Sequence, residues 1–467
     1  MRGPNFQPIS TYVPIQQVSD KLPIRATSFH PSGEAYVVGT NSKTLKICKY
    51  PNAETIDSLV RDYHNNSTRS YANNQSITYE ESSQGEQSTL IIHPTEPELY
   101  FTFLHIHCSS VYCAKFNQKG DLLATGSNDR MIHLIKYNSK NHVPVGNEYK
   151  FPIHSNTVRD LCFLTQPYKL NDEWAQAQQQ TSSDFLVSAG DGQFEVNILD
   201  CNAMKLVQSY KKEHTSTVMS LDRDLTSSNN FISGSLDGTI RVWDTRCKRS
   251  VSIITTKMAN KQQLCADSTP IGGDTLASEI SDAKQIQLDN DNLAVIDRDE
   301  SFCTAVDEEE DGQILEFAPT NGIPKTVTKI SSNENKGLPV GCVRLDPTGR
   351  LMVSGHEDGS CMFYDIRAGR VIQLFKVHED KIRTLDFSPN SYYLLTGSYD
   401  HKVRLTDIQG HLMNKLKSVE VADLGDKCVQ AAWHPNDLNF VTTCANGSAT
   451  LWSIPNFDQW MDSVIMD

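Results

Sequence analysis

Short runs of alternating apolar and polar residues recur along the chain. Five of them read IRATSF, VYCAKF, VRDLCF, IRTLDF and VQAAWH, and they begin at residues 24, 111, 158, 382 and 429. Because successive side chains of a strand point to opposite faces, this period of two indicates strands with one buried side. No long segment carries the apolar spacing of an amphipathic helix. The pattern therefore predicts an all-β fold.

These runs belong to a larger repeated unit. Most copies continue with a turn rich in Pro or Gly, an apolar strand ending near Gly-Ser, a tight turn at Asp or Asn, and a third alternating strand. Repeats of roughly 40–45 residues with this order are typical of a β-propeller. Seven copies align, the third only with a gap at its tight turn, and they cover 29–50, 116–137, 184–200, 234–246, 345–365, 387–407 and 433–453. We therefore expect a single seven-bladed propeller.

The stretch GSLDGTIRVWDTR, residues 234–246, resembles a WD repeat, the unit of the WD-repeat β-propeller family. In that family a His, a Ser or Thr, an Asp and a Trp form a hydrogen-bonded network within one blade. The corresponding residues here are His214, Ser233, Asp237 and Trp243. The sixth copy has Thr406 at the Trp position and keeps the other three as His378, Thr396 and Asp400. Since a buried indole, imidazole and carboxylate each need a partner, the resemblance implies a structural network without catalysis.

The two ends of the repeated region predict how the ring closes. The last copy ends at Ile454, and the segment ISTYVPIQQV at 9–18 precedes the first blade with no strand of its own to pair with. An open ring would leave strand edges exposed, so we expect 9–18 to form the outer strand of the seventh blade. The alternative is a six-bladed ring with an extra strand domain.

The repeats predict three parts of the chain. Residues 1–23 supply the closing strand, 24–454 form the propeller, and 455–467 form a tail. Three long insertions, 57–97, 165–183 and 257–336, separate copies of the repeat, and their composition predicts loops. The net charge of -14 is concentrated in the third insertion, where 265–316 holds fifteen acidic and two basic residues. The charge therefore says little about the partners of the propeller itself.

The sequence gives no sign of an enzyme or a cofactor site. The phosphate-binding, nucleophile-elbow and zinc-protease motifs are absent, and the twelve cysteines include no CxxC pair. No apolar run reaches the roughly 20 residues of a membrane helix, and no secretory signal opens the chain. No basic patch with interleaved aromatics suggests nucleic acid. We expect a cytoplasmic protein that works by binding other proteins, without cofactor, metal or membrane.

The family resemblance also suggests where a partner binds, because WD-repeat propellers often use the narrow face of their channel. One residue just after the first apolar position of each inner strand is expected there, and the set includes Arg25, Tyr112, Arg159, Met219, Arg383 and Gln430. The residues before the tight turns add Asn41, Asn128 and Tyr399. Arginines beside tyrosines suit an acidic peptide. The alternative is that these arginines pair with carboxylates of neighbouring blades.

Several phrases are more specific than the general repeat. The segments NSKTLKICKYP, LLATGSND, HSNTVRDLCF, EDGSCMFYDIRAGRVIQ and YYLLTGSYDHKVRLTDIQG are similar to the C-terminal propeller of the nemitin family, microtubule-associated WD-repeat proteins of neurons and motile cilia. The resemblance implies a cytoskeletal scaffold in the ciliary axoneme, at its central-pair apparatus, with axonemal or microtubule-associated subunits, tubulin or acidic peptides as partners. Nemitin carries helical modules before its propeller, whereas the repeats here begin within the first thirty residues.

A second function fits the same residues. A propeller of this kind can serve as the substrate receptor of a ubiquitin ligase or of another regulatory complex, with its channel face holding a short peptide. A structural subunit would use the insertions at 57–97 and 257–336 within its assembly, whereas a receptor could lose both and still bind.

Overall fold

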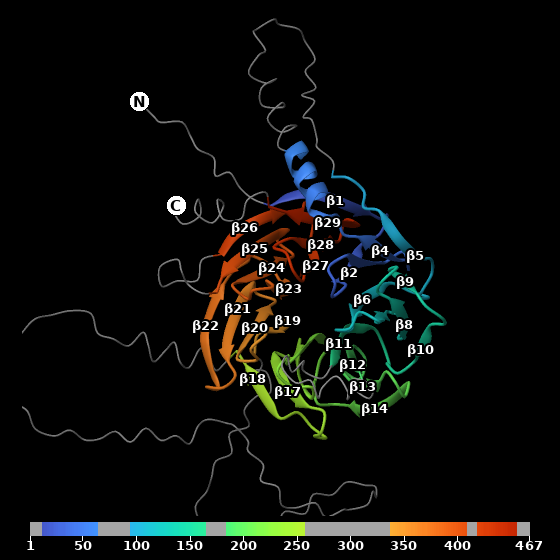
Figure 1. Cartoon of the computed structure of the whole chain (residues 1–467). Helices are drawn as coiled ribbons and strands as arrows, with labels where there is room; N and C mark the ends of the chain where they lie inside the picture. Colours follow the sequence, from blue (N-terminus) through green and yellow to red (C-terminus); the bar gives the residue numbers. More distant parts are fainter. Residues whose placement is uncertain (1–11, 64–93, 165–183, 257–336, 409–417, 455–467) are drawn as a thin grey trace, which may run out of the picture. The chain divides into compact units, whose positions relative to one another are not determined.

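The computed structural model describes residues 12–63, 94–164, 184–256, 337–408 and 418–454. Their strands form seven antiparallel sheets arranged in a ring around a channel (Figure 1). Blade 1 contains β2 (Ile24–Phe29), β3 (Ala35–Thr40), β4 (Leu45–Lys49) and β5 (Leu99–Phe103). Blade 2 contains β6 (Val111–Phe116), β7 (Leu122–Ser127), β8 (Ile132–Asn138), β9 (Val143–Pro144) and β10 (Tyr149–Phe151). Blade 3 contains β11 (Val158–Leu164), β12 (Phe185–Gly190), β13 (Val196–Asp200) and β14 (Lys205–Tyr210).

The other four blades follow in chain order, except for one strand. Blade 4 contains β15 (Val218–Arg223), β16 (Asn230–Ser235), β17 (Thr239–Asp244) and β18 (Ser252–Thr255). Blade 5 contains β19 (Val340–Leu345), β20 (Leu351–His356), β21 (Ser360–Asp365) and β22 (Arg370–Lys376). Blade 6 contains β23 (Ile382–Phe387), β24 (Tyr393–Ser398), β25 (Lys402–Asp407) and β26 (Ser418–Asp423). Blade 7 combines β27 (Cys428–Trp433), β28 (Phe440–Cys444) and β29 (Ser448–Ser453) with β1 (Val13–Ser19) from the start of the chain.

The ring closes as the sequence predicts. Strand β1 lies beside β29 (Figure 1). The two strands pair antiparallel, with Val13 opposite Ser453 and Ser19 opposite Ser448. The pairing is irregular between Pro14 and Gln16, where the missing amide hydrogen of proline is tolerated at the sheet edge. The seven-bladed all-β fold is therefore confirmed, and the six-bladed alternative is wrong. Residues 9–11 of the predicted strand lie outside the described residues.

A short helix accompanies the closing strand. Residues 53–63 are helical, and Asn52 caps the first turn by accepting a hydrogen bond from the Thr55 amide at 2.8 Å. Ile56 and Val60 face the core and pack in the same apolar cluster as Val13 of β1. The prediction of loop over 57–97 is thus wrong at 57–63, because these two side chains gain burial by forming one face of a helix. The rest of the predicted insertion at 64–93, the insertions at 165–183 and 257–336 and the tail at 455–467 lie outside the described residues.

The inner strands of neighbouring blades are joined by polar side chains. Three aspartates accept a backbone N–H from the next blade: Asp160 from Leu221 at 2.8 Å, Asp222 from Leu345 at 2.7 Å and Asp386 from Trp433 at 2.8 Å. At the closure, the Gln430 side chain accepts from the Thr27 amide at 2.9 Å. These bonds stabilise the relative positions of the blades around the channel.

Every inner strand starts with the same irregularity. The register shifts between its first and third residues in β2, β6, β11, β15, β19, β23 and β27. A β-bulge leaves its extra residue outside the ladder and re-aims the side chain. The extra residues are Arg25, Tyr112, Arg159, Met219, Gly341, Arg383 and Val429. Six of these seven residues, all except Gly341, line the narrow opening of the channel described below. Among the helices that the structure describes, none has the length and apolar character needed to cross a membrane.

Candidate partner-binding channel

The predicted network of blade 4 is assembled within one sheet and the loop before it. Nδ1 of His214 donates to Asp237 at 2.9 Å, and the Ser233 hydroxyl lies 2.8 Å from Nε2 of the same ring. The indole N–H of Trp243 donates to that hydroxyl at 2.8 Å. All four side chains are buried. Every polar group of this set therefore has a partner inside the blade, and none is left to bind a ligand.

The charges of this network follow from its burial. Burial lowers the pKa of His214 more than the neighbouring Asp237 raises it, so the imidazole is neutral at physiological pH. Burial raises the pKa of Asp237, but the hydrogen bond from His214 outweighs this and holds the pKa below its ordinary value. An ionised carboxylate beside a neutral imidazole lets one ring nitrogen donate to the carboxylate while the other accepts from the hydroxyl.

Two other blades repeat the arrangement without the tryptophan. In blade 6, His378 lies 2.9 Å from Asp400 and 2.8 Å from the Thr396 hydroxyl. Thr406, at the Trp position, pairs instead with the Ser418 hydroxyl at 2.7 Å. Blade 2 has the same contacts among three residues, His107, Thr125 and Asp129. The histidine contacts therefore form without a tryptophan in both blades.

Blade 3 has a network that the alignment of its tight turn did not reveal. His154 lies 2.8 Å from the Ser188 hydroxyl, and its Nδ1 is 3.4 Å from a carboxylate oxygen of Glu195. Glu195 also accepts from the Ser155 amide at 2.7 Å. Burial opposes ionisation, but these hydrogen bonds lower the pKa of Glu195 to about 2. Glu195 supplies the carboxylate because Asp191, at the predicted turn position, pairs with Arg159.

The bulge residues of the inner strands line an opening at one end of the channel. Its lining includes Gln430 and, at the bulge positions, five other residues of the predicted partner-binding face: Arg25, Tyr112, Arg159, Met219 and Arg383. We call these five residues the arginine opening. They come from blades 1, 2, 3, 4 and 6, and only the ring brings them together. The volume enclosed by these residues and their neighbours in the lining is about 60 Å³, so only a small group fits the opening.

Tyr112 is the centre of the arginine opening. The guanidinium carbons of Arg25 and Arg159 each lie 4.9 Å from its ring centroid, within the range of a cation–π contact. The Arg159 guanidinium also donates twice to Asp191 of its own blade, at 2.7 and 3.0 Å. Arg25 donates only through Nε, to the Asn41 side chain at 2.9 Å. The alternative prediction of arginine–carboxylate pairs therefore describes Arg159, although its partner lies in its own blade.

The remaining arginine of the opening, Arg383, has fewer polar contacts than Arg25 and Arg159. Arg383 has no hydrogen bond or ion pair with another residue that the structure describes, and its buried Nε lacks a partner there. A buried donor without an acceptor costs free energy unless a ligand or solvent supplies one. The opening thus presents the guanidinium of Arg383 and the outer nitrogens of Arg25 to an incoming acceptor.

The other predicted face residues are placed differently. Gln430 is the third residue of β27, so Val429 takes the bulge position and Gln430 bonds to Thr27 of blade 1. The sequence alignment is off by one here because the strand starts at Cys428. The Asn128 side chain accepts from the Thr157 hydroxyl, and the Tyr399 ring is covered by the Lys427 ammonium at 5.4 Å. Neither Asn128 nor Tyr399 lines the arginine opening.

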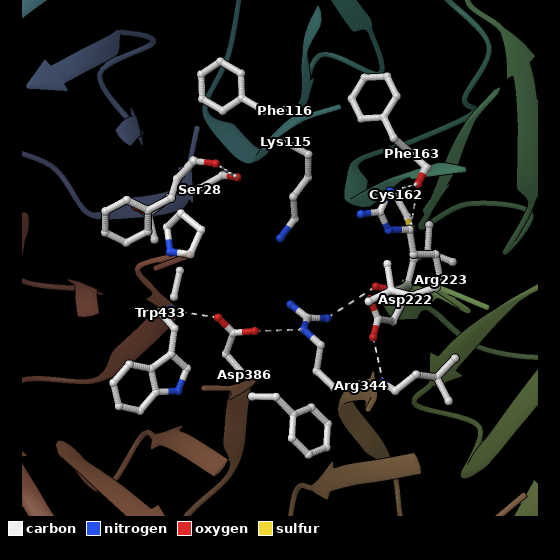
Figure 2. Close-up of a pocket in the computed structure, with 18 of the residues that line it drawn as sticks. Ser28, Lys115, Phe116, Cys162, Phe163, Asp222, Arg223, Arg344, Asp386 and Trp433 are labelled. Atoms are coloured by element: carbon white, nitrogen blue, oxygen red, sulfur yellow. Dashed lines mark hydrogen bonds and ion pairs between the residues drawn. The ribbon is translucent and has the colours of Figure 1, made fainter. Parts of the chain in front are cut away.

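A wider cavity of about 380 Å³ occupies the other end of the channel (Figure 2). Arg344 lies there between Asp222 and Asp386, with its Nε 3.9 Å from a carboxylate oxygen of Asp386. Burial lowers the pKa of Arg344, but the carboxylates around it outweigh that effect and raise the pKa. These carboxylates also accept backbone bonds between blades, as described above. Sequence reasoning missed this cluster, although each member is the fifth residue of an alternating run.

Reactive groups are not assembled anywhere in the described part of the chain. No cluster of three or more His, Cys, Asp or Glu residues there could hold a metal ion. Burial raises the pKa of the channel thiol of Cys162 to about 12, which keeps it protonated. The channel therefore offers binding groups without a nucleophile or a metal site among the described residues.

Comparison with known families finds the same repeat. Four segments match the WD40 family, described as WD domain, G-beta repeat, at 98–136, 204–244, 325–365 and 369–407. Together with the seven blades, these matches support the WD-repeat β-propeller family.

Three relatives illustrate the breadth of the similarity. The guanine nucleotide-binding protein subunit beta of Oryza sativa subsp. japonica is 24% identical over 320 residues, which cover 66% of this chain and 72% of the relative. Striatin of Mus musculus is 20% identical over 465 residues, 96% of this chain and 52% of the relative. The periodic tryptophan protein 2 homolog of Neurospora crassa is 24% identical over 123 residues, 26% of this chain. The aligned regions thus span about half of striatin and only 13% of the Neurospora protein.

Proposed function

We propose, on the premise that the chain is a WD-repeat β-propeller, that it is a structural subunit whose arginine opening holds an acidic segment of a partner protein. The WD40 matches and the named relatives indicate a non-catalytic interaction scaffold, since propellers of this family generally bind other proteins. The rice relative is itself named as a subunit. Function on such a fold depends on the residues at the site, and here these are the bulge residues of the channel.

The observation that carries the proposal is the surplus of positive charge at the opening. Asp191 balances Arg159, and Asp160, which also lines the opening, accepts backbone N–H groups, so Arg25 and Arg383 have no ion pair with a carboxylate among the described residues. Guanidinium groups bind carboxylates through two parallel hydrogen bonds, and Tyr112 adds a flat amphipathic surface between two of them. A glutamate or aspartate side chain fits the small volume of the opening, whereas a folded surface would have to present it on a protruding loop.

The assembly that we propose is microtubule-based, in the central-pair apparatus of the ciliary axoneme. The support is the similarity of five segments to the nemitin family, strongest between residues 346 and 410. Axonemal or microtubule-associated subunits, or tubulin itself, would then supply the acidic segment.

Localisation with chemical cross-linking tests this placement. A tagged full-length chain expressed in ciliated cells should concentrate in the axoneme and cross-link to microtubule-associated neighbours. A diffuse cytosolic signal without such cross-links would contradict the axonemal proposal. It would leave the binding chemistry of the arginine opening open to the peptide measurements described in the Discussion.

A second candidate, the substrate receptor of a ubiquitin ligase or another regulatory complex, is favoured by one observation. All five residues of the arginine opening lie outside the three predicted insertions, so the opening is built without them. Removing 257–336 separates the two functions. A receptor should keep its partner in cells after this deletion, whereas a structural subunit that uses the insertion should leave the axoneme.

A further inference from the structure

The wide end of the channel carries a ring of side chains at one repeated position. They are the fifth residues of the seven inner strands: Ser28, Lys115, Cys162, Asp222, Arg344, Asp386 and Ala432. The bulge residues of the arginine opening are the second residues of the same strands. Three residues of a strand span roughly 10 Å, so the two sets lie at different depths of the channel.

The charges of this ring are distributed unevenly. Asp222, Arg344 and Asp386 come from adjacent blades 4, 5 and 6, and the arginine lies between the two carboxylates. Lys115 comes from blade 2, and its neighbours in the ring are Ser28 and Cys162, which are uncharged. Its ammonium has no hydrogen bond or ion pair with another residue that the structure describes, although its charge acts on Asp386 by opposing the burial that raises the pKa of that carboxyl. Figure 2 shows the Lys115 side chain extending into the cavity from the side opposite Arg344.

The exposed rim of this cavity is mainly apolar. Five of the seven sixth residues of the inner strands are aromatic, but Phe163 and Trp433 are buried in the apolar clusters of the blades, and the sixth residue of blade 4 is the cation Arg223. Turn residues complete the rim with Leu225, Pro347, Pro389 and Pro435. Leu225 is 41% exposed although it is a large apolar side chain. A cation surrounded by an apolar rim suits an anionic group carried on an apolar segment.

We propose that this second mouth binds an acidic side chain of a protein partner, with the Lys115 ammonium as its ion-pair partner and the rim in contact with apolar residues on either side of it. The cavity of about 380 Å³ holds several side chains, so a loop can enter it without displacing the Arg344 cluster. A free inorganic anion would use Lys115 but would gain nothing from the apolar rim at Leu225, Pro347 and Pro389, which favours a peptide. The propeller would then be held at both ends of its channel by different segments.

Selection from two peptide pools tests the proposal. Both pools consist of blocked peptides with random flanks, and they differ only in a central glutamate or glutamine. The bait is the full-length chain with Arg25→Glu, Arg159→Glu and Arg383→Glu, which disables the arginine opening. We expect glutamate peptides with apolar flanks to be enriched, and the best of them to bind about ten-fold more tightly than their glutamine counterparts. Adding Lys115→Met should abolish this difference, whereas Lys140→Met, at an exposed lysine elsewhere on blade 2, should preserve it.

Three outcomes would overturn the proposal. The first is no enrichment of the glutamate pool, and the second is an enrichment that Lys115→Met leaves unchanged. The third is displacement of the selected peptides by inorganic phosphate at equal concentration, which would identify a small-anion site. Thermal unfolding of both lysine variants distinguishes lost binding from lost folding. Because the arginine opening is disabled in the bait, failure here leaves the first proposed function unaffected.

Discussion

The blade 4 network and the arginine opening are both sets of polar side chains on the same propeller, but they differ in how their groups are paired. In the network, His214, Ser233 and Trp243 bond to one another and to a carboxylate within one blade. In the opening, Arg383 has no partner among the described residues, and Arg25 has only an amide. Paired polar groups hold a fold together, and groups left over are available to a ligand.

The difference also has a topological cause. A network lies inside a single sheet and its preceding loop, so each blade can provide hydrogen-bond partners for its own polar side chains. The opening collects one residue from each of several blades at a bulge, where side chains leave the ladder and point into the channel. Changes to the first set should therefore affect stability, and changes to the second should affect binding.

The largest expected effect is on stability. Replacing Trp243 by Ala removes a fully buried ring that packs on Phe231 and Tyr210 and donates to Ser233. We expect the free energy of unfolding to fall by about 3–5 kcal/mol, measured by chemical denaturation. Trp243→Phe is the matched control, since it keeps most of the packing and loses the donor, and should cost about 1–2 kcal/mol. A loss below about 1 kcal/mol for Trp243→Ala would mean that the network is not structural.

The next effect is on binding. Reversing Arg25, Arg159 and Arg383 to Glu should weaken binding of a labelled oligoglutamate peptide by about a hundred-fold, measured by fluorescence anisotropy, because attraction becomes repulsion. The matched control reverses three exposed lysines elsewhere, Lys140, Lys205 and Lys248, and so changes the net charge by the same amount. Equal loss in both variants would show that overall charge, and no particular site, attracts the peptide.

A smaller effect concerns pH. In blade 5, His356 is buried beside Ser354, and burial lowers its pKa to about 4. The unfolded chain binds this proton near pH 6.5, so its contribution to stability is present above that pH and is lost as the pH falls towards 4. Between pH 6.5 and 5 we expect a loss of about 1–2 kcal/mol from this residue.

The pH effect is measured as a slope. His356→Gln should flatten the dependence of the unfolding free energy on pH, whatever it does to stability at pH 7. His401→Gln, which replaces an exposed histidine in the tight turn of blade 6, is the control and should leave the slope unchanged. If the unfolding free energies of the wild type and of His356→Gln depend on pH with the same slope, the pH effect does not come from His356.

The smallest effect tests the substitute for tryptophan in blade 6. Ser418→Ala removes the hydroxyl that pairs with Thr406 at 2.7 Å, and we expect a loss of about 0.5–1.5 kcal/mol in denaturation experiments. Binding at the arginine opening should not change. A shift in peptide affinity would show that the two sets of polar groups are coupled.

Much of the fold could be predicted because it depends on local patterns. Alternation marks the strands, and the unpaired segment before the first blade indicates the closing strand, which pairs with β29 as expected. The helix at 53–63 was missed because its two buried residues, Ile56 and Val60, are too few to stand out as a helical period. Only the closing strand gives them a surface to pack against.

The sites were less accessible to sequence reasoning. The carboxylate of blade 3 comes from Glu195, beyond the turn, because Asp191 is held by Arg159, and no spacing rule reveals that exchange. The family resemblance placed Arg25 and Arg383 at the channel face, but the bulge that turns them into the channel leaves no trace in the alternation of apolar residues. The inner strand of blade 7 begins at Cys428, one residue before the start that the sequence pattern indicates. The prediction therefore named Gln430 where Val429 occupies the bulge position.

Site-specific photo-cross-linking from the arginine opening tests the central claim most directly. Met219 lies in the opening between the arginines, makes no polar contact with another described residue, and can be replaced by a photoreactive amino acid in living cells. We expect cross-links to a glutamate- or aspartate-rich segment of one partner, lost when Arg25 and Arg383 are changed to Glu. Cross-links to segments without acidic residues, or none at this position while a probe at Lys140 gives them, would contradict it.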